Sequence, residues 1–523
     1  MREGQTIVIG AGVGGLACAI DLASQGIAVR VMERASAPGG KMRVLPAGGT
    51  AVDAGPTVFT LRGVFEDLFA SAGARLADRL ALTPLEVLAR HAWAGGAQLD
   101  LFADRARSAD AIGRFAGLEA ARGYLAFCRR AQRVHDALDR DFMRAPRPSP
   151  SGLVRSIGLR GVRAMLEASP FRSLWSALGR DFADPRLRQL FARYATYVGS
   201  SPFACPATLM LIAHVEQEGV WSVEGGMGAL ARALAEVARS CGATIDTDAH
   251  VARIEMRDGR ASGVALADGT ELAADAVVCN ADAAALAAGC FGAEIADRTR
   301  GLATRGRSLS AHTWTLRAEA RGFGFLRHNV FFSRDYRAEF DAIFGGGRAP
   351  GEPTVYVCAQ DRDDAALPDA SGPERMLVLA NAPANGDMRG ADPGEASRMA
   401  RAVQEVLKRC GAEIDLDHPT ATATGPAEFA TLFPATGGAL YGRASHGWMA
   451  SFARPGTTTP VPGLFLAGGS AHPGAGVPMT ALSGRLAAGA VREHLDSIAR
   501  SRATVTRGGT RTAGATTGAS GSS

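Results

Sequence analysis

Residues 6–34 read TIVIGAGVGGLACAIDLASQGIAVRVMER, and this stretch decides the fold. Its first residues, 6–9, form a short apolar, β-branched run of the kind that a buried parallel strand needs. Gly10, Gly12 and Gly15 follow in the spacing G-x-G-x-x-G. In this motif the first glycine permits a tight turn, the second lets the backbone approach a pyrophosphate, and the third lets the next helix pack against the strand.

The residues after the glycines complete a strand–helix–strand unit. Apolar residues recur at helical spacing from Leu16 to Ala23, and Gly26 ends the predicted helix. Residues 27–32 predict a second strand, and Glu33 follows it where an acid accepts hydrogen bonds from a ribose. The helix N-terminus offers N–H groups and a positive dipole end to phosphate. This order of elements predicts a dinucleotide site; the alternative is a tight strand–helix turn that binds nothing.

A second glycine loop follows the acid. Gly39 and Gly40 make it flexible, and Lys41 is placed to reach a phosphate or a ribose. Flavoproteins with two dinucleotide-binding domains commonly have such an extension and NAD enzymes do not need one, so FAD is favoured over NAD. A further tight turn, Gly-Pro-Thr at residues 55–57, lies near the flavin ring in such proteins.

Length and composition limit the class of protein. A chain of 523 residues is too long for one simple core, so we expect two or three interlocked domains. Hydrophobic residues make up 47% and charged residues 21%, which is typical of a globular protein with a large buried volume. The net charge of +5 gives no reason to expect a nucleic-acid partner. It suits loose contact with anionic lipid without requiring it.

The cysteines and the chain ends indicate the compartment. The eight cysteines show neither a C-x-x-C pair nor metal-ligand spacing, so we expect buried free thiols in a reducing compartment and no metal. The opening MREGQTIVIG leads directly into a strand, so no signal peptide is expected. Because no uninterrupted apolar run reaches about 18 residues, we expect any membrane contact to be peripheral.

The remaining sequence divides into alternating types of segment. The segment before residue 220 is rich in helix formers, with Pro146, Pro148, Pro150 and Pro170 as breakers. GRASGVALADGTELAADAVVCNAD predicts a hairpin with a DGT turn and then a buried strand that ends at Cys279. HTWTL, TVYVCA and a helix near 394–410 suit a covered sheet beside a substrate.

We therefore predict three regions along the chain. They are a discontinuous FAD-binding domain at 1–80, 220–300 and 426–500, a substrate-binding, helical and membrane-facing region at 81–219 and 301–425, and a disordered tail at 501–523.

The C-terminal stretch GLFLAGGSAHPGAGVPMTALS, residues 463–483, resembles the signature of bacterial phytoene-desaturase-type carotenoid desaturases. The N-terminal glycine motif and GVWSVEGGM at 219–227 fit the same family, so the resemblance spans nearly the whole chain apart from the tail. It implies an α/β fold, namely a two-dinucleotide-binding-domain flavoprotein. Such a protein has a Rossmann-like FAD domain, an inserted substrate domain and a helical region.

Two further stretches, HAWAGGAQLDLFAD at 91–104 and the segment 193–221, look most similar to 1-hydroxycarotenoid 3,4-desaturases. This likeness implies an FAD-dependent enzyme that introduces the C-3,4 double bond into 1-hydroxycarotenoids such as 1-hydroxyneurosporene, in spheroidene- or spirilloxanthin-type carotenoid biosynthesis. The implied partners are an apolar C40 carotenoid, a membrane surface, and quinone or oxygen as electron acceptor. The implied location is cytoplasmic, peripherally on the inner photosynthetic membrane.

The resemblance also implies where the flavin is contacted. Asn280 ends a strand, where parallel sheets place ligands, and Val251 offers only its backbone near the adenine. The full set of implied contacts is Glu33, Lys41, Thr57, Val58, Val251, Asn280, Leu432, Gly468 and Met479.

The chemistry leaves some roles open. The cofactor must accept the hydride, because no ordinary side chain can do so. No residue is assigned as proton acceptor: His472 is either that group or a histidine that positions its loop, and His91 and His312 are expected to be structural. Five aromatic residues either line a substrate tunnel or pack in the core, with core packing favoured for most of them: Trp175, Tyr194, Tyr197, Phe203 and Trp221.

Three alternative functions remain. The first is a desaturase of phytoene or neurosporene. The second is a flavin amine oxidase, which commonly needs a lysine near flavin N5, whereas the chain has only Lys41 and Lys408. The third is a non-catalytic prenyl-lipid carrier, and the intact glycine motif with Glu33 and Lys41 argues against it.

Overall fold

The apolar run at the N-terminus forms β1 (Gln5–Ile9), the central strand of a parallel sheet. Its neighbours come from distant parts of the chain, in the order β21 (Leu464–Leu466), β13 (Ala276–Cys279), β1, β2 (Ala28–Met32) and β9 (Thr244–Asp246). The computed structural model describes residues 5–146, 149–167, 169–303, 306–362, 372–388 and 394–508. The strand–helix–strand unit predicted from residues 6–34 is confirmed, in an α/β fold.

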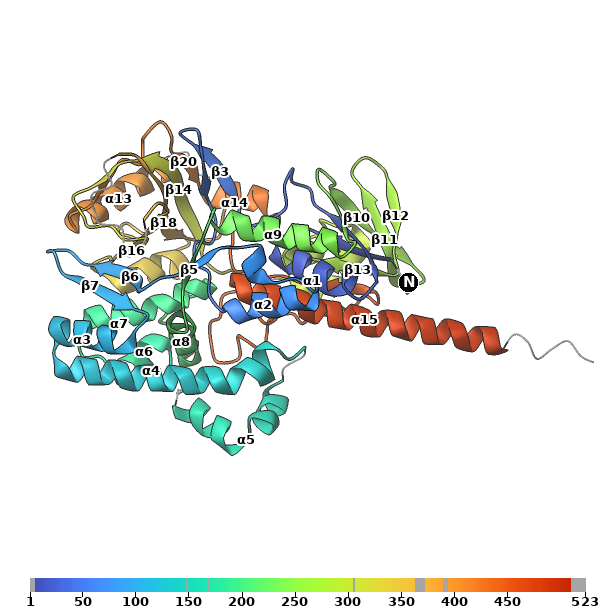
Figure 1. The fold of residues 1–523 in the computed structure, drawn as a ribbon, viewed down its shortest axis with the longest axis horizontal. Coiled ribbons are helices and arrows are strands. Elements are labelled where there is room, and N and C mark those ends of the chain that lie inside the picture. Colours follow the sequence, from blue (N-terminus) through green and yellow to red (C-terminus); the bar gives the residue numbers. More distant parts are fainter. Residues whose placement is uncertain are drawn as a thin grey trace, which may run out of the picture.

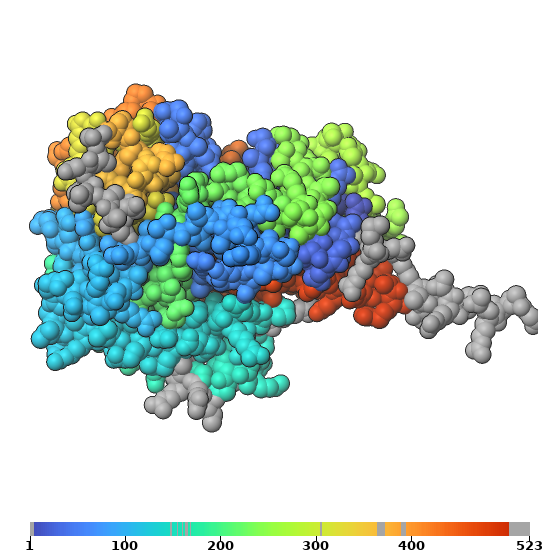
Figure 2. Space-filling model, in the orientation of Figure 1, coloured from blue at the N-terminus to red at the C-terminus, as the bar shows by residue number. Residues whose placement is uncertain are grey.

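Helices cover this sheet closely. Every residue of α1 (Val13–Ala23) is buried, because the helix packs against α9 (Met227–Ser240), α15 (Val477–Gly508) and α2 (Arg62–Ser71) as well as the sheet. Figure 1 shows α15 leaving this packed region as one long helix. Figure 2 shows the N-terminal, central and C-terminal segments adjoining on the same face. The parallel sheet thus depends on both ends of the chain.

The C-terminal helix runs further than expected. Residues 501–508 were assigned to a disordered tail, but α15 continues to Gly508. The expectation is wrong there because neither Gly nor Pro interrupts residues 490–507, so nothing stops the i to i−4 bonding. The rest of the expected tail, 509–523, lies outside the described residues.

Small antiparallel units lie beside the two larger sheets. The predicted hairpin with the DGT turn is confirmed as β11 (Arg260–Leu266) and β12 (Glu271–Ala273), next to β10 (Val251–Arg257). Three two-stranded units complete the set: β3 (Val44–Ala47) with β4 (Thr50–Asp53), β5 (Leu82–Pro84) with β8 (Trp221–Val223), and β15 (Ala320–Arg321) with β19 (Glu413–Ile414).

The second large sheet has seven strands. Their order is β20 (Thr422–Thr424), β14 (Ser310–Ala318), β18 (Glu374–Ala382), β17 (Val355–Ala359), β16 (His328–Phe331), β6 (Val87–Ala92) and β7 (Gln98–Phe102). All neighbours are antiparallel except β16 and β6. The helix expected near 394–410 is α13 (Glu395–Arg409). The segment 81–219 was expected to be helical, but its first residues form β5, β6 and β7, because β6 adds to an edge built much later in the chain.

Helices dominate the chain after β7. They pack under the seven-stranded sheet, and α5 lies beyond α4 at the lower edge of the molecule (Figure 1). They are α3 (Arg105–Ala116), α4 (Leu118–Leu138), α5 (Pro150–Glu167), α6 (Leu174–Leu178), α7 (Pro185–Ala192) and α8 (Leu211–Gln217). The remaining short helices are α10 (Ala283–Ala287), α11 (Ala293–Thr299), α12 (Tyr336–Phe340) and α14 (Pro426–Leu432).

Two further expectations can be compared with the structure. All eight cysteines are free thiols, and most are buried as expected, but Cys290 is exposed because it lies in the turn after α10. Across the described part of the chain, no helix combines the length and apolarity needed to cross a membrane.

Candidate functional site

A cavity of about 1480 Å³ lies where the parallel sheet meets the seven-stranded sheet. The carboxyl ends of three parallel strands open into it, at Ile9, Met32 and Asn280. In open parallel sheets this edge is where ligands bind. The other end of the same cavity is lined by apolar side chains of the helical segment and of the second sheet.

The structure brings almost all of the expected site residues together. Every one of them except Gly15 lines this cavity, namely Gly10, Gly12, Glu33, Lys41, Thr57, Val58, Val251, Asn280, Leu432, Gly468 and Met479. Gly15 lies behind the wall, where a Cβ atom would overlap the carbonyl oxygen of Gly10. It therefore has the helix-packing role that the motif predicts.

The glycine loop has the form that a pyrophosphate needs. A Cβ on Gly12 would lie 2.8 Å from Asn280 Nδ2, and one on Gly14 would lie 2.9 Å from the Gly468 nitrogen. Glycine at both positions therefore keeps three segments in close contact. Within the described residues no side chain caps α1, so its first N–H groups are left for an anionic ligand. These residues fit the phosphates of a dinucleotide.

Glu33 is held rigidly at the end of β2. Its side chain is buried, Oε2 accepts a hydrogen bond from Ala11 N at 2.7 Å, and Oε1 accepts one from Ala35 N at 2.9 Å. The carboxylate thus ties the glycine loop to the loop after β2 and still lines the cavity. A carboxylate oxygen has more than one lone pair, so both oxygens can also accept from ribose hydroxyls.

Lys41 lies in the loop after β2 and contacts the segment after α14. Its Nζ donates to the Leu440 carbonyl at 2.6 Å and lies 5.1 Å from the centre of the Phe433 ring. Burial lowers the pKa of Lys41, whereas the Asp282 carboxylate raises it. Further basic side chains line the cavity, so it suits an anionic ligand; they include Arg34, Arg43, Arg232 and Arg454.

Thr57 connects the flavin-binding part to the second sheet. Its Oγ1 lies 2.7 Å from Tyr356 Oη, which in turn lies 2.7 Å from His328 Nδ1. Burial lowers the pKa of His328 to about 3, so this imidazole is neutral. Val58 packs against the core of the helical segment, as does Met479 from the start of α15. The expected flavin neighbours thus lie between the two sheets.

The other expected contacts lie at the ends of elements or in the loops that follow them. Asn280 Nδ2 donates to the Gly10 carbonyl at 3.2 Å, and Gly468 N donates to Ser483 Oγ at 3.1 Å. Leu432 ends α14, and its carbonyl accepts from Arg34. Val251 begins β10 and is buried. All four hold loops that border the cavity.

The apolar half of the cavity was only partly foreseen. Of the five aromatic residues considered from the sequence, Tyr197 lines it, and the other four pack elsewhere in the described structure. Sequence reasoning missed several lining residues. These are Phe142, Phe171, Tyr336, Tyr356, Tyr441, Trp448 and Phe452. One sequence pattern could have located part of this wall. On β18, every second residue from Leu377 through Leu379 to Asn381 lines the cavity, as alternation along a strand predicts.

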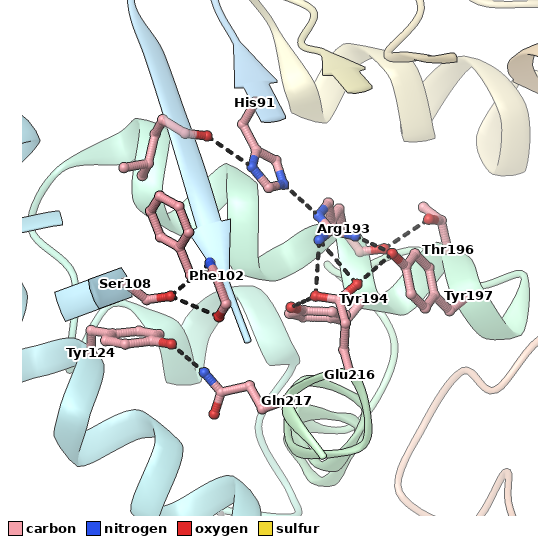
Figure 3. A network of polar contacts seen from close by, with 11 residues as sticks. His91, Phe102, Ser108, Tyr124, Arg193, Tyr194, Thr196, Tyr197, Glu216 and Gln217 are labelled. Carbon is pink, nitrogen blue, oxygen red and sulfur yellow. Dashed lines mark hydrogen bonds and ion pairs between the residues drawn. The ribbon is translucent and has the colours of Figure 1, made fainter. Parts of the chain in front are cut away.

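A buried polar network borders this apolar half (Figure 3). Arg193 Nε donates to His91 Nε2 at 3.0 Å, and Arg193 Nη2 lies 3.2 Å from Glu216 Oε2. Tyr194 and Tyr197 both donate to the Glu216 carboxylate. Burial alone would lower the pKa of Arg193, but Glu216 and the two tyrosines hold it above its usual value. The network therefore contains a buried ion pair between Arg193 and Glu216.

The histidines considered from the sequence have structural contacts. His472 is buried, its Nε2 lies 2.9 Å from the Phe142 carbonyl, and burial lowers its pKa to about 4. These contacts favour the loop-positioning alternative. His91 Nδ1 lies 3.2 Å from the Leu99 carbonyl, and His312 Nε2 lies 3.2 Å from Glu395 Oε1.

One titratable cluster lies away from the site. His135, Asp136 and His214 have ligand atoms within 4.8 Å of one another, although no metal was expected from the sequence. His214 is already engaged, since its Nδ1 lies 3.2 Å from Arg105 Nη2 and its Nε2 lies 3.4 Å from Glu218 Oε1. The contact with Arg105 links α8 to α3, so His214 has a structural role.

Comparison with known proteins identifies the family. The family model of flavin containing amine oxidoreductases matches residues 13–492. The chain is 50% identical over 519 residues to a hydroxyneurosporene desaturase of Rubrivivax gelatinosus, covering 99% of both chains. It is 45% identical over 496 residues to a protein of the same name from Cereibacter sphaeroides, covering 95% of this chain and 99% of that one.

A solved structure supports the fold alone. An oxidoreductase from Methanosarcina mazei superposes with a TM-score of 0.59 at 19% identity, covering 92% of this chain and 99% of that chain. Together with the cavity and its glycine loop, these likenesses settle the class of protein. The chain belongs to the flavin containing amine oxidoreductase family, among its carotenoid desaturases, and is an FAD-dependent oxidoreductase.

Proposed function

We propose that this protein desaturates the C3–C4 bond of 1-hydroxycarotenoids such as 1-hydroxyneurosporene. The observation that carries the proposal is the single cavity, which joins a dinucleotide-type glycine loop to a long apolar space. A C40 polyene needs such a space, because it has no charge and few polar atoms. The names of the relatives at 50% and 45% identity supply the hydroxylated substrate.

The roles within the site follow from its two ends. Bound FAD would supply the hydride acceptor for one carbon of the bond, and the neighbouring carbon would lose a proton. The residues of the chain hold the dinucleotide at the glycine loop and align the polyene against it. The apolar wall, including Leu377, Leu379 and Val330, excludes water from the reacting bond.

The test is a paired-substrate assay. Purified protein loaded with FAD is given 1-hydroxyneurosporene or phytoene separately, and polyene spectra are recorded anaerobically with and without a quinone. A red-shifted product from 1-hydroxyneurosporene supports the proposal, and a product from phytoene alone contradicts it. Turnover that requires quinone identifies the electron acceptor, whereas turnover restored only by air identifies oxygen.

We also propose that the cavity opens toward a membrane surface. Leu166, Phe171 and Trp448 line the cavity and are nevertheless 62%, 72% and 53% exposed. Phe171 and Trp448 form an edge-to-face pair, with ring centres 5.5 Å apart. Exposed apolar residues gathered around an opening are typical of contact with lipid, where a carotenoid is dissolved. The corresponding location is the cytoplasmic side of the inner membrane.

Vesicle flotation tests this second proposal. The variants F171D and W448D should float poorly with vesicles of anionic phospholipid, because a charge at the rim opposes insertion. Leu118 is 74% exposed and does not line the cavity, so L118D is the matched control and should float like the wild type. Equal flotation of all four proteins would refute a membrane-facing rim.

A further inference from the structure

Polar side chains interrupt the apolar wall of the cavity at several places. Arg193, Tyr197 and Tyr356 line it, and they come from two separate elements. Tyr197 lies on a short 3-10 helix, Arg193–Val198, and Tyr356 lies on β17. A hydrocarbon substrate gives no reason to place hydrogen-bonding groups there, because each one must be desolvated to admit it.

The pairing of the second sheet aligns these groups. One row of paired residues crosses it on a single face: Thr313, Leu379, Tyr356, Val330 and His91. The first four residues of the row line the cavity. His91, the fifth, accepts a hydrogen bond from Arg193, so the sheet anchors the guanidinium at the end of this row.

The hydroxyl of Tyr197 retains one hydrogen-bonding position. It donates to Glu216 Oε1 at 2.9 Å and accepts from Arg193 Nη1. A phenol has one donor and two acceptor positions, so one acceptor position on this oxygen remains. Glu216 and Arg193 fix the direction of the hydroxyl, because both are buried and bonded to each other.

The hydroxyl of Tyr356 is held by partners from both parts of the site. It bonds to Thr57 Oγ1 and to His328 Nδ1, both at 2.7 Å. Its pKa lies well above the usual value, chiefly through burial and next through Cys358, so it is a neutral phenol. Thr57 is a residue expected beside the flavin ring, so Tyr356 places a hydroxyl next to the reacting bond.

Resting on the function proposed above, we propose that Tyr197 and Tyr356 together bind the tertiary hydroxyl of the substrate. The hydroxyl is on C1, and only C2 separates that carbon from the C3–C4 bond. A group that recognises the alcohol must therefore lie beside the flavin, as Tyr356 does through Thr57. The alcohol donates to a phenol oxygen, and its own oxygen can accept from the guanidinium of Arg193.

This arrangement fixes the direction in which the substrate enters. The hydroxylated end lies innermost, against the second sheet, and the rest of the polyene extends toward the rim at Phe171 and Trp448. A carotenoid end without the hydroxyl would leave two phenols and a guanidinium facing hydrocarbon. Sites built to bind a hydroxyl discriminate against analogues that lack one for this reason.

The experiment compares two substrates on four proteins. FAD-loaded wild type, Y197F, Y356F and Y194F are assayed with 1-hydroxyneurosporene and with neurosporene, which lacks the hydroxyl. Tyr194 is the matched control, because it bonds to the same Glu216 carboxylate but is buried away from the cavity. Flavin content and melting temperature are measured for each protein, so a folding defect is not taken for a change in preference.

We expect the wild type to prefer the hydroxylated substrate in kcat/KM. Y197F and Y356F should each lower that preference about five- to tenfold, the usual effect of losing one hydrogen bond, mainly through KM. Y194F should leave it unchanged. An unchanged preference in both cavity variants refutes the hydroxyl site, and so does an equal loss in Y194F.

Failure of the proposed function would look different. A wild type that converts neither substrate contradicts desaturation itself, whereas a wild type that converts both equally contradicts only the hydroxyl site. If a variant does not fold, the binding of each carotenoid to the wild-type protein still tests the hydroxyl site. Flavin fluorescence measures this binding at equilibrium. Equal affinity for 1-hydroxyneurosporene and neurosporene would overturn the hydroxyl site.

Discussion

Glu33 joins two loops through one side chain. Its two oxygens accept hydrogen bonds from Ala11 N and Ala35 N, and the side chain is only 7% exposed. A buried carboxylate with two backbone donors is strongly held, because hydrogen bonds to a charged group are worth more than neutral ones. The geometry of the expected ribose site therefore depends on the charge of this residue.

The variant E33Q tests that dependence. The amide nitrogen of glutamine would face one of the two backbone donors, so one hydrogen bond is lost and the loop shifts. We expect FAD affinity to fall at least about tenfold, measured by quenching of flavin fluorescence on titration of the flavin-free protein. E428Q is the control, since Glu428 also accepts from a backbone amide, Gly425 N at 2.8 Å, but does not line the cavity. Unchanged affinity in E33Q would contradict the assignment.

Glu339 is a buried carboxyl that accepts its hydrogen bonds in the described structure from neutral groups. It accepts from Thr354 N at 3.0 Å and Asn381 Nδ2 at 3.2 Å, and burial raises its pKa to about 7. The unfolded chain has a carboxyl pKa of about 4.3, so between these values the folded protein holds the extra proton. The contribution of Glu339 to stability is therefore full below about pH 4 and is lost as the pH rises through 7.

The variant E339Q should remove this pH dependence. Its free energy of unfolding relative to the wild type should increase between pH 5 and pH 8 by on the order of 2 kcal/mol, because only the wild type must ionise a buried group. Urea unfolding at several pH values measures the difference. A difference that stays constant over this range would show that Glu339 does not titrate there.

At the scale of elements, α1 and α15 are joined through glycine. A Cβ on Gly484 would overlap the Gly14 carbonyl oxygen, so the two helices touch backbone to backbone. Gly489 lies five residues further along α15, where a Cβ would meet only Arg492 Nη2, at 3.8 Å. The same helix thus offers a crowded glycine and an open one.

These two glycines give opposite predictions. G484A should destabilise the protein by about 2 kcal/mol or more, because the added methyl group pushes α15 away from α1. G489A should be neutral or stabilise it by up to about 1 kcal/mol, since alanine favours the helix. Thermal unfolding of both variants measures the effect, and similar melting temperatures would contradict the close helix contact.

Sequence patterns predicted those elements whose signal is local. β1, α1 and β2 follow from one apolar strand, one glycine motif and one helical period, and the β11–β12 hairpin follows from its DGT turn. The β6–β7 hairpin was overlooked although its signal is local, with Gly95 and Gly96 in its turn. Only the pairing of β6 with β16 joins residues far apart along the chain. Local periodicity holds no information about such a partner.

The candidate site divides in the same way. The residues of its dinucleotide half belong to contiguous sequence motifs, so they could be predicted, and they meet in the cavity. Its apolar half is assembled from alternate residues of several strands and single residues of several helices. Tyr356 illustrates the difficulty, because its position opposite Leu379 and Val330 depends on strand register that no single stretch encodes.

For the whole molecule, the cavity is the place where the separate cores meet. Met479 packs against both the core of the parallel sheet and the core of the helical segment, and Gln360 binds the backbone of Asp53 through both its amide atoms. A ligand that fills this space contacts all of these parts at once. Its binding free energy therefore adds to the stability of the whole protein.

FAD should accordingly raise the melting temperature of the flavin-free protein. Saturation at about 100 times the dissociation constant should add about 2.7 kcal/mol, because only the folded state binds the flavin. Thermal unfolding at increasing FAD concentration checks this, with riboflavin, which lacks the adenosine and phosphates, as the control. A melting temperature independent of FAD would contradict a site formed jointly by these segments.

The positions of β21 and α15 in the chain also determine when the parallel sheet can be completed during translation. β1 is made first, but the strand and the helix that complete its sheet are residues 464–466 and 477–508. At about 5–20 residues per second, translation takes roughly 20 seconds or more to cover that span. During that time α15 does not yet cover α1, whose residues are all buried in the folded protein. Cofactor loading therefore belongs to the close of translation, and the nascent chain must be protected from aggregation until then.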